Sequence, residues 1–139
     1  MNATKEYSLQ WDASLKLNVD EIDEQHQHLI GLAERVFSIS SPLEDIVVVI
    51  NSIRELQSYI QTHFADEERL MVKHGYPLLE EHRVLHRRIT FEVETMLHTT
   101  RDVMELVENM KKVMRKWVIQ HILREDRKIA QFLHNLPNQ

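Results

Sequence analysis

Apolar residues recur every three or four positions in four separate stretches of this chain, and this spacing limits its fold more than any other feature. Residues spaced in this way share one face of an α-helix, because one turn takes about 3.6 residues. The first stretch follows Asp20, which can cap a helix, and ends in the serines around Ser40. Its inward residues are Ile22, His26, Leu29, Ala33 and Val36. Each stretch therefore predicts an amphipathic helix with one buried face.

Glycine and proline disfavour the interior of a helix, and the 139 residues contain only two glycines and three prolines. Where they occur, they therefore indicate the ends of the other helices. Residues 41–44 (Ser-Pro-Leu-Glu) offer an N-cap, a proline at the first helical position and a capping-box glutamate, and they predict the start of the second helix. Residues 75–77 (Gly-Tyr-Pro) predict its end. The third helix is expected from about Pro77 to His98, and the fourth from residues 99–100 (Thr-Thr) to Pro137.

The three later helices carry the same kind of inward stripe. The second helix places on one face Ile53, Leu56, Ile60, His63, Glu67, Leu70 and His74. The third places there Leu79, His82, His86, Ile89, Val93 and Met96. The fourth presents Val103, Leu106, Met110, Val113, Trp117 and His121, and continues past Ile122, Ile129 and Leu133. Short connections between such helices favour antiparallel neighbours.

The segment before the first helix has a different pattern. Apolar and polar residues alternate at Tyr7, Leu9 and Trp11, and again at Leu15, Leu17 and Val19. A period of two is typical of extended backbone, so residues 1–19 are expected to form an extended arm that lies on the core. The length suits one domain. The prediction is an all-α single domain over residues 1–139, built as an up-down-up-down antiparallel four-helix bundle (20–136) with an extended N-terminal arm.

Charge and composition narrow the classes of partner. The formal net charge of −5 comes without a basic cluster, so we expect neither nucleic acid nor an anionic membrane as a partner. The longest apolar run, residues 46–50, is too short to span a membrane, and the N-terminus lacks a signal peptide's pattern; we expect a cytoplasmic protein. The chain has no cysteine, so nitrogen and oxygen must hold any metal ion.

Polar residues interrupt the stripes where a bundle would normally bury leucine or isoleucine. They are His26, His63, Glu67, His82, His86 and His121. Mutual hydrogen bonding could satisfy a lone inward histidine, but six groups on four helices are harder to satisfy. Each unsatisfied group would cost about 1–3 kcal/mol, against a total stability of about 5–15 kcal/mol. A metal ion satisfies the nitrogens and the carboxylate together, so the pattern indicates a metal site.

The types and the number of candidate ligands favour two transition-metal ions. Many imidazoles with few carboxylates and no thiolate suit zinc, copper, iron or nickel. The set is larger than the four ligands of a structural zinc, which favours a dinuclear site. The paired Glu-x-x-His motifs of ferritin-like di-iron proteins are missing from the sequence, where only Asp23 stands three residues before a candidate, His26.

Four motifs in order carry a family resemblance. They are IDEQH from Ile22, HFADEERLM from His63, HRVLH from His82 and HILRED from His121. With them the chain resembles the hemerythrins, in their single-domain bacterial form (bacteriohemerythrin), over nearly its whole length. The resemblance implies two non-heme irons joined by an oxo or hydroxo bridge, with Glu67 and Asp126 also bridging. The ligands that it implies are His26, His63, Glu67, His82, His86, His121 and Asp126.

Spacing and resemblance disagree about one ligand. Four residues after His121 stands Glu125, whereas the resemblance implies Asp126, five residues on. Spacing alone leaves both open. In the acidic run, spacing selects Glu67 as the partner of His63; Asp66 and Glu68 are expected to point away from that face and to matter little for the metal.

The resemblance also implies a function. On two six-coordinate irons, five histidines, two bridging carboxylates and a single-atom bridge leave one position open. The resemblance implies reversible dioxygen binding there, at the iron held by His26 and His63, for storage, delivery or sensing and without catalysis. An enzyme acting on peroxide or nitric oxide, or an oxygen- or redox-sensing module, remains the alternative. We expect a monomer that works with a reductase or an oxygen-using enzyme.

Other residues have expected roles near or away from the site. Reversible binding requires a dry pocket, so the candidates for its wall are Ile22, Leu29, Ile60, Phe64, Ile119 and Ile122. Met114 and Trp117 are interpreted as core packing. His28, His98 and His134 are expected in solvent, and His74 near the C-terminal dipole of its helix.

Overall fold

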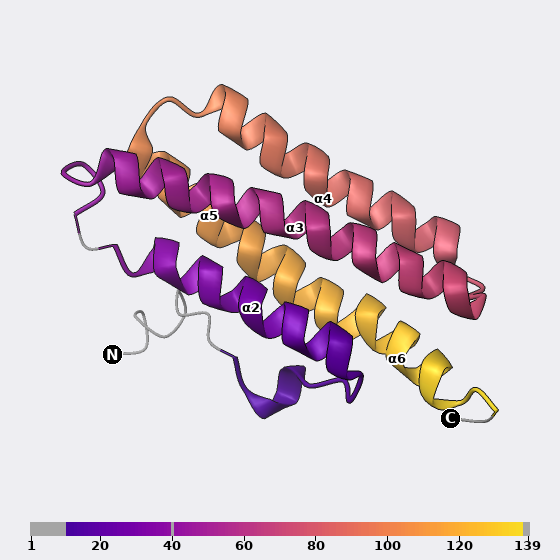
Figure 1. Ribbon diagram of the computed structural model, residues 1–139. Helices are drawn as coiled ribbons and strands as arrows, with labels where there is room; N and C mark the ends of the chain where they lie inside the picture. The colour runs from indigo at the N-terminus through magenta and orange to yellow at the C-terminus, as the bar shows by residue number, and fades with distance from the viewer. Residues whose placement is uncertain (1–10, 40, 138–139) are drawn as a thin grey trace.

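Four helical rods form an antiparallel bundle, as predicted (Figure 1). The computed structural model describes residues 11–39 and 41–137, without the side chains of Val118 and Ile119. The rods are α2 (Asp20–Phe37), α3 (Ile46–His74), α4 (Leu79–Thr99), and a composite of α5 (Val103–Met114), η2 (Arg115–Ile119), η3 (His121–Asp126) and α6 (Arg127–His134). Helices α2 and α4 each contact both α3 and α5, so the ring of helices closes around one core.

The cap predicted for the first helix is wrong. Asp20 is the first residue of α2, Val19 is its N-cap, and no side-chain cap bond forms there. The carboxylate that serves this end is Asp23, which accepts the backbone N–H groups of Leu17 (2.8 Å) and Asn18 (2.9 Å). Asn18 has a left-handed backbone (φ 62°), which asparagine tolerates, and this turn aims both amides at Asp23.

The predicted start of the second helix is also wrong. Residues 42–44 form a turn in which the Ser41 carbonyl accepts the N–H groups of Glu44 and Asp45, both at 3.0 Å. Helix α3 begins at Ile46, because the non-helical backbone of Asp45 (ψ 37°) separates it from the turn. Likewise Pro77 lies in the turn before α4.

The predicted helix stop at Gly75 is confirmed. Gly75 is the C-cap of α3 and has a left-handed backbone (φ 68°), which costs glycine little because it has no Cβ. The next amide, of Tyr76, donates to the Met71 carbonyl at 2.9 Å and satisfies one of the last free acceptors of the helix.

The described part of the N-terminal arm, residues 11–19, packs its apolar side chains against the core as their alternation predicted, but it is not wholly extended. Residues Ala13–Leu15 form a short 3-10 helix, η1. Leu15 and Leu17 are buried in the core, while Tyr7 and Leu9 lie outside the described residues. His134 is exposed, as expected, and its Nε2 also donates to the Leu17 carbonyl at 3.1 Å, a contact that joins α6 to the arm.

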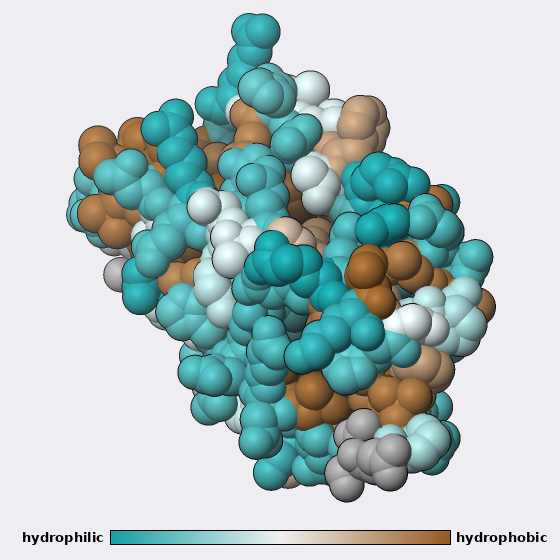
Figure 2. Space-filling view, turned by 45° about the vertical axis from the view of Figure 1, so that its right-hand side comes forward, coloured by the Kyte–Doolittle hydropathy of each residue, from teal (hydrophilic) through white to brown (hydrophobic). Residues whose placement is uncertain are grey.

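The surface of the bundle is mainly polar at the end where α6 lies. Figure 2 shows hydrophilic side chains over most of this face, with apolar ones in separate patches. Among the described residues, no helix is both long enough and apolar enough to cross a membrane. In contrast to this polar surface, the six inward polar residues of the stripes are enclosed between the helices, where the exposed fraction of each is 6% or less.

Candidate metal centre

All seven side chains of the predicted ligand set meet inside the bundle. His26 comes from α2, and His63 and Glu67 come from α3. The other four come from α4 and η3, namely His82, His86, His121 and Asp126. Asp126 has no exposed surface, and His26 has none either. The inward stripes therefore converge on one buried cluster that fits a metal site.

Glu67 divides its two oxygens between two sets of histidines. Its Oε1 lies 2.7 Å from Nε2 of His82 and 3.0 Å from Nε2 of His86. Its Oε2 faces the opposite set, at 3.5 Å from Nε2 of His63 and 3.9 Å from Nε2 of His26.

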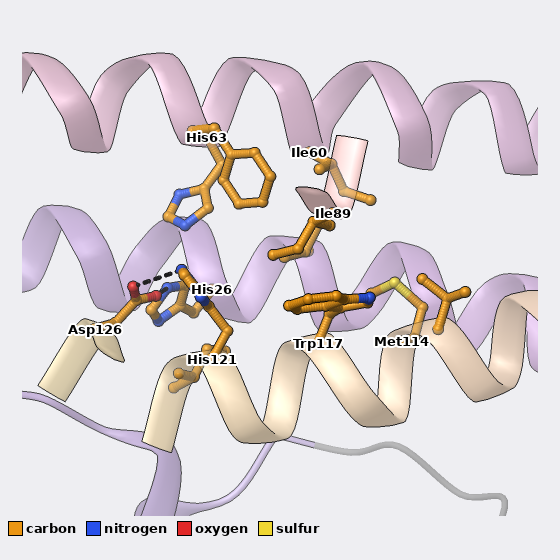
Figure 3. Close-up of a pocket in the computed structure, with 12 residues that line it drawn as sticks. His26, Ile60, His63, Ile89, Met114, Trp117, His121 and Asp126 are labelled. Carbon is orange, nitrogen blue, oxygen red and sulfur yellow. Dashed lines mark ion pairs between the residues drawn. The ribbon is translucent and has the colours of Figure 1, made fainter. Parts of the chain in front are cut away.

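Asp126 divides its oxygens in the same way. Its Oδ1 lies 3.0 Å from Nε2 of His121 and 3.1 Å from Nε2 of His82, whereas Oδ2 lies 2.8 Å from Nε2 of His26 (Figure 3). Two groups of candidate ligands result, and they share both carboxylates. One group is Glu67, His82, His86, His121 and Asp126, and the other is His26, His63, Glu67 and Asp126.

Several buried atoms of the cluster make no hydrogen bond to any described residue. They are both ring nitrogens of His26 and of His121, Oε2 of Glu67, and both oxygens of Asp126. His26 Nε2 and Asp126 Oδ2 lie only 2.8 Å apart without the geometry of a hydrogen bond. Leaving so many buried groups unpaired is costly. Cations between the histidines and the carboxylates would satisfy both, so these residues fit a metal centre.

His63 has the protonation state and the ring orientation of a metal ligand. Burial lowers the pKa of His63 to about 4, against the opposing effect of the Glu67 carboxylate. The ring is therefore neutral at pH 7. Its Nδ1 donates to Oε1 of Gln25 at 2.7 Å, so the lone pair is on Nε2, which faces Glu67. A lone pair aimed at a carboxylate oxygen calls for a cation between them.

His82 and the two carboxylates, by contrast, are ionised at pH 7. Burial alone would lower the pKa of His82, but the nearby carboxylates of Asp126 and Glu67 outweigh it and raise that pKa to about 10. Burial and Asp126 would raise the pKa of Glu67, yet the hydrogen bonds from His82 and His86 lower it to about 2. The pKa of Asp126 is also held well below its usual value: burial opposes this, but His121 outweighs it. Two buried carboxylates thus present negative charge to the centre.

A change of helix type selects Asp126 over Glu125. The fourth rod is one continuous helix, as expected, but η2 and η3 are π-helical. In a π-helix an N–H bonds to the carbonyl five residues back, so residues five apart come closer to one face than they do in an α-helix. His121 and Asp126 consequently both point inward, whereas Glu125 is only half-buried, with Lys128 Nζ 3.4 Å away.

The two neighbours of Glu67, Asp66 and Glu68, make hydrogen bonds towards the cluster that spacing did not predict, while their expected small effect on metal binding stays a prediction. Glu68 Oε2 accepts from Nδ1 of His86 at 2.8 Å. Asp66 Oδ2 accepts from Nε2 of Gln25 at 2.8 Å, and Gln25 in turn holds His63. Both contacts join different helices, so spacing along one helix gave no sign of them.

A cavity of about 30 Å³ adjoins the cluster and is lined by both histidines of the smaller ligand group, His26 and His63, together with His121 and Asp126 (Figure 3). Four of the expected wall residues line it, namely Leu29, Ile60, Phe64 and Ile122. Ile22 is buried elsewhere, and the Ile119 side chain lies outside the described residues. Sequence reasoning missed Ile89, Val113, Met114 and Trp117 as lining residues. Their helical spacing could not distinguish packing from lining a cavity.

The remaining histidines lie outside both ligand groups. His74 is half-buried in the last turn of α3, where its position suits the helix dipole. His28 is exposed, and its ring lies 4.4 Å from that of Tyr59, edge to face. His98 is exposed as expected.

Comparison with known proteins points to one family. The family model described as "Hemerythrin HHE cation binding domain" matches residues 17–133. A bacteriohemerythrin of Campylobacter jejuni (strain 81-176) is 27% identical over 119 residues, 85% of this chain and 90% of its own length. A bacteriohemerythrin of Stenotrophomonas maltophilia is 25% identical over 94% of this chain and 85% of its own. A myohemerythrin of Theromyzon tessulatum is 29% identical over 81% of this chain and 83% of its own.

Proposed function

Because the chain belongs to the hemerythrin HHE cation-binding family, we propose that it binds dioxygen reversibly at a non-heme di-iron centre. Such binding would serve storage, delivery or sensing of oxygen rather than catalysis. The irons would be held by His26, His63, Glu67, His82, His86, His121 and Asp126. Two irons held by these residues would supply a redox-active pair.

One observation carries the proposal: the two ligand groups share both carboxylates. A carboxylate that turns one oxygen to each group is placed to bridge two ions. Glu67 and Asp126 both do so, from opposite sides of the bundle. With both carboxylates shared, one position has five protein ligands and the other, beside His26 and His63, has four, so the second position has one protein ligand fewer.

The cavity supports a small, uncharged ligand at that position. It adjoins His26 and His63, and its volume of about 30 Å³ suits a molecule of two or three atoms. Apolar side chains form its wall apart from the cluster residues and the indole of Trp117, whose N–H donates outward to Glu92 at 2.7 Å. An apolar wall hinders water and protons from reaching the ligand, and reversible binding requires this.

The proposal is tested by iron content and by optical spectra of the full chain. Protein loaded with ferrous iron without oxygen is expected to hold about two irons per chain. Its spectrum should gain a band on exposure to air and lose that band when oxygen is removed. One zinc and no iron after iron-replete expression would contradict a di-iron centre. A single irreversible oxidation would contradict reversible binding and favour a redox enzyme acting on peroxide or nitric oxide.

A further inference from the structure

The acidic run at residues 66–68 serves the cluster through all three of its residues. Glu67 enters the centre, while Asp66 and Glu68 reach around it to opposite sides. On one side Glu68 Oε2 accepts directly from Nδ1 of His86 at 2.8 Å. On the other side Asp66 Oδ2 accepts from the Gln25 amide at 2.8 Å, and the Gln25 carbonyl oxygen accepts from Nδ1 of His63 at 2.7 Å.

These contacts fix which ring nitrogen is free for a metal. An imidazole that donates from Nδ1 keeps its lone pair on Nε2, and Nε2 is the atom that points inward in both rings. The Gln25 amide can hold only one orientation, because the Asp66 carboxylate needs a donor and the His63 N–H needs an acceptor.

The two partners differ in charge. His86 donates to a carboxylate, whereas His63 donates to a neutral amide. A carboxylate draws the Nδ1 proton more strongly and makes Nε2 a better electron donor to a metal. Arg83 contacts Glu68 through Nε at 3.3 Å, and Arg69 pairs with Asp66. Because each carboxylate already has a cationic partner, the difference arises from the direct hydrogen bond and not from a long-range field.

We propose that Glu68 and Gln25 are positioning residues that add to the difference between the two metal positions, which already differ by one histidine. Glu68 strengthens the position held by His82, His86 and His121. Gln25, anchored by Asp66, holds His63 with a neutral partner and leaves the position beside the cavity the weaker one. The inference rests on the proposed dinuclear centre, and it assigns a chemical reason for the cavity-side position to be the exchangeable one.

The test compares Glu68→Gln with Glu80→Gln in the full chain. Both changes remove one charge near Arg83, but Glu80 binds Arg83 Nη1 at 2.6 Å, makes no hydrogen bond to a ligand histidine among the described residues, and is 69% exposed, so it is the matched control. Zinc binding to the metal-free chain, measured by chelator competition, should show two unequal steps. Glu68→Gln should weaken the tighter step by about 10- to 100-fold and leave the other unchanged. Gln25→Ala should weaken the looser step.

Two further readouts separate positioning from a merely structural role. In the zinc-loaded chain, the His86 Nδ1–H resonance in the proton NMR spectrum should move in Glu68→Gln and stay in place in Glu80→Gln. In the iron-loaded chain, the reduction potential should rise in Glu68→Gln, because a less donating ligand stabilises the oxidised ion less.

Two equal zinc steps in the native chain would overturn the inference. So would a Glu68→Gln chain whose resonance, potential and zinc affinities match those of Glu80→Gln. These results are independent of dioxygen. Unequal zinc steps that depend on Glu68 would support the inference even if the iron-loaded chain failed to bind dioxygen reversibly, and that failure would count against the proposed function alone.

Discussion

At the scale of single residues, a shift of one position along the helix decides whether a carboxylate enters the cluster. Glu125 and Asp126 are neighbours, yet only Asp126 is buried, with its two oxygens facing His26, His82 and His121. Glu125 makes a surface contact with Lys128. Their different surroundings make the pair a natural comparison.

Asp126→Ala should lose most of its iron and its dioxygen-binding amplitude, since both metal positions lose a negatively charged ligand. Glu125→Ala, prepared in the same way, should retain both. Iron analysis and the oxygenation spectrum measure the two effects. Loss in Glu125→Ala with retention in Asp126→Ala would remove Asp126 from the ligand set.

His82 makes metal binding depend on pH. Its pKa of about 10 means that the metal-free protein carries a proton there at pH 7 to 8, and a metal ion must displace that proton from Nε2. We expect zinc to release protons on binding and to bind more tightly as the pH rises towards 10. A pH indicator in a weakly buffered solution measures the release. A titration that releases none at pH 7 would contradict a protonated His82.

At the scale of secondary-structure elements, η3 and the start of α2 show how short segments place the site. The π-helical hydrogen bonding of η3 turns His121 and Asp126 towards the same side. At the start of α2, Asp23 fixes the arm through two backbone amides, one turn before His26. Both are local features, but neither follows the spacing of an ordinary α-helix.

The corrected cap of α2 can be tested by stability. Asp23→Ala should lower the free energy of unfolding of the metal-free protein by about 1.5–3 kcal/mol, because it removes two hydrogen bonds to an ionised group. Asp20→Ala, in the same helical turn, should cost at most about 0.3–1 kcal/mol through the helix dipole. Urea denaturation of both variants measures the difference. Equal losses would mean that the charge, and not the hydrogen bonds, serves this helix end.

At the scale of the whole molecule, the cluster joins all four rods of the bundle. Its ligands come from α2, α3, α4 and η3, so a bound metal ties together elements that are otherwise held by packing. A metal that binds only the folded chain adds its binding free energy to stability.

Removing the metal should therefore lower the melting temperature. At a free metal concentration 100 times the dissociation constant, the added stability is about 2.7 kcal/mol per site. Thermal unfolding followed by circular dichroism, before and after chelation and again after reloading, measures the effect. An unchanged melting temperature would show that no metal binds the folded state preferentially.

The sequence by itself determined the helical class and most of the cluster. Apolar spacing requires helices with one buried face, and Gly75 can end α3 because glycine alone adopts a left-handed backbone at little cost. Residues on the same stripe must face the same way, so His63 and Glu67 could be paired from their spacing, as could His82 and His86. These inferences depend only on neighbours along one helix.

The tertiary structure alone decided the features that depend on partners across helices. Counting 3.6 residues per turn does not predict the π-helical segment that turns Asp126 inward. Asp126 could be identified only from the family resemblance or from the structure. The start of α3 at Ile46 and the anchoring of His134 on the arm also escaped prediction. The bonds from His63 to Gln25 and from His86 to Glu68 join residues 38 and 18 positions apart. Spacing specifies a helix face, but only packing specifies what that face meets.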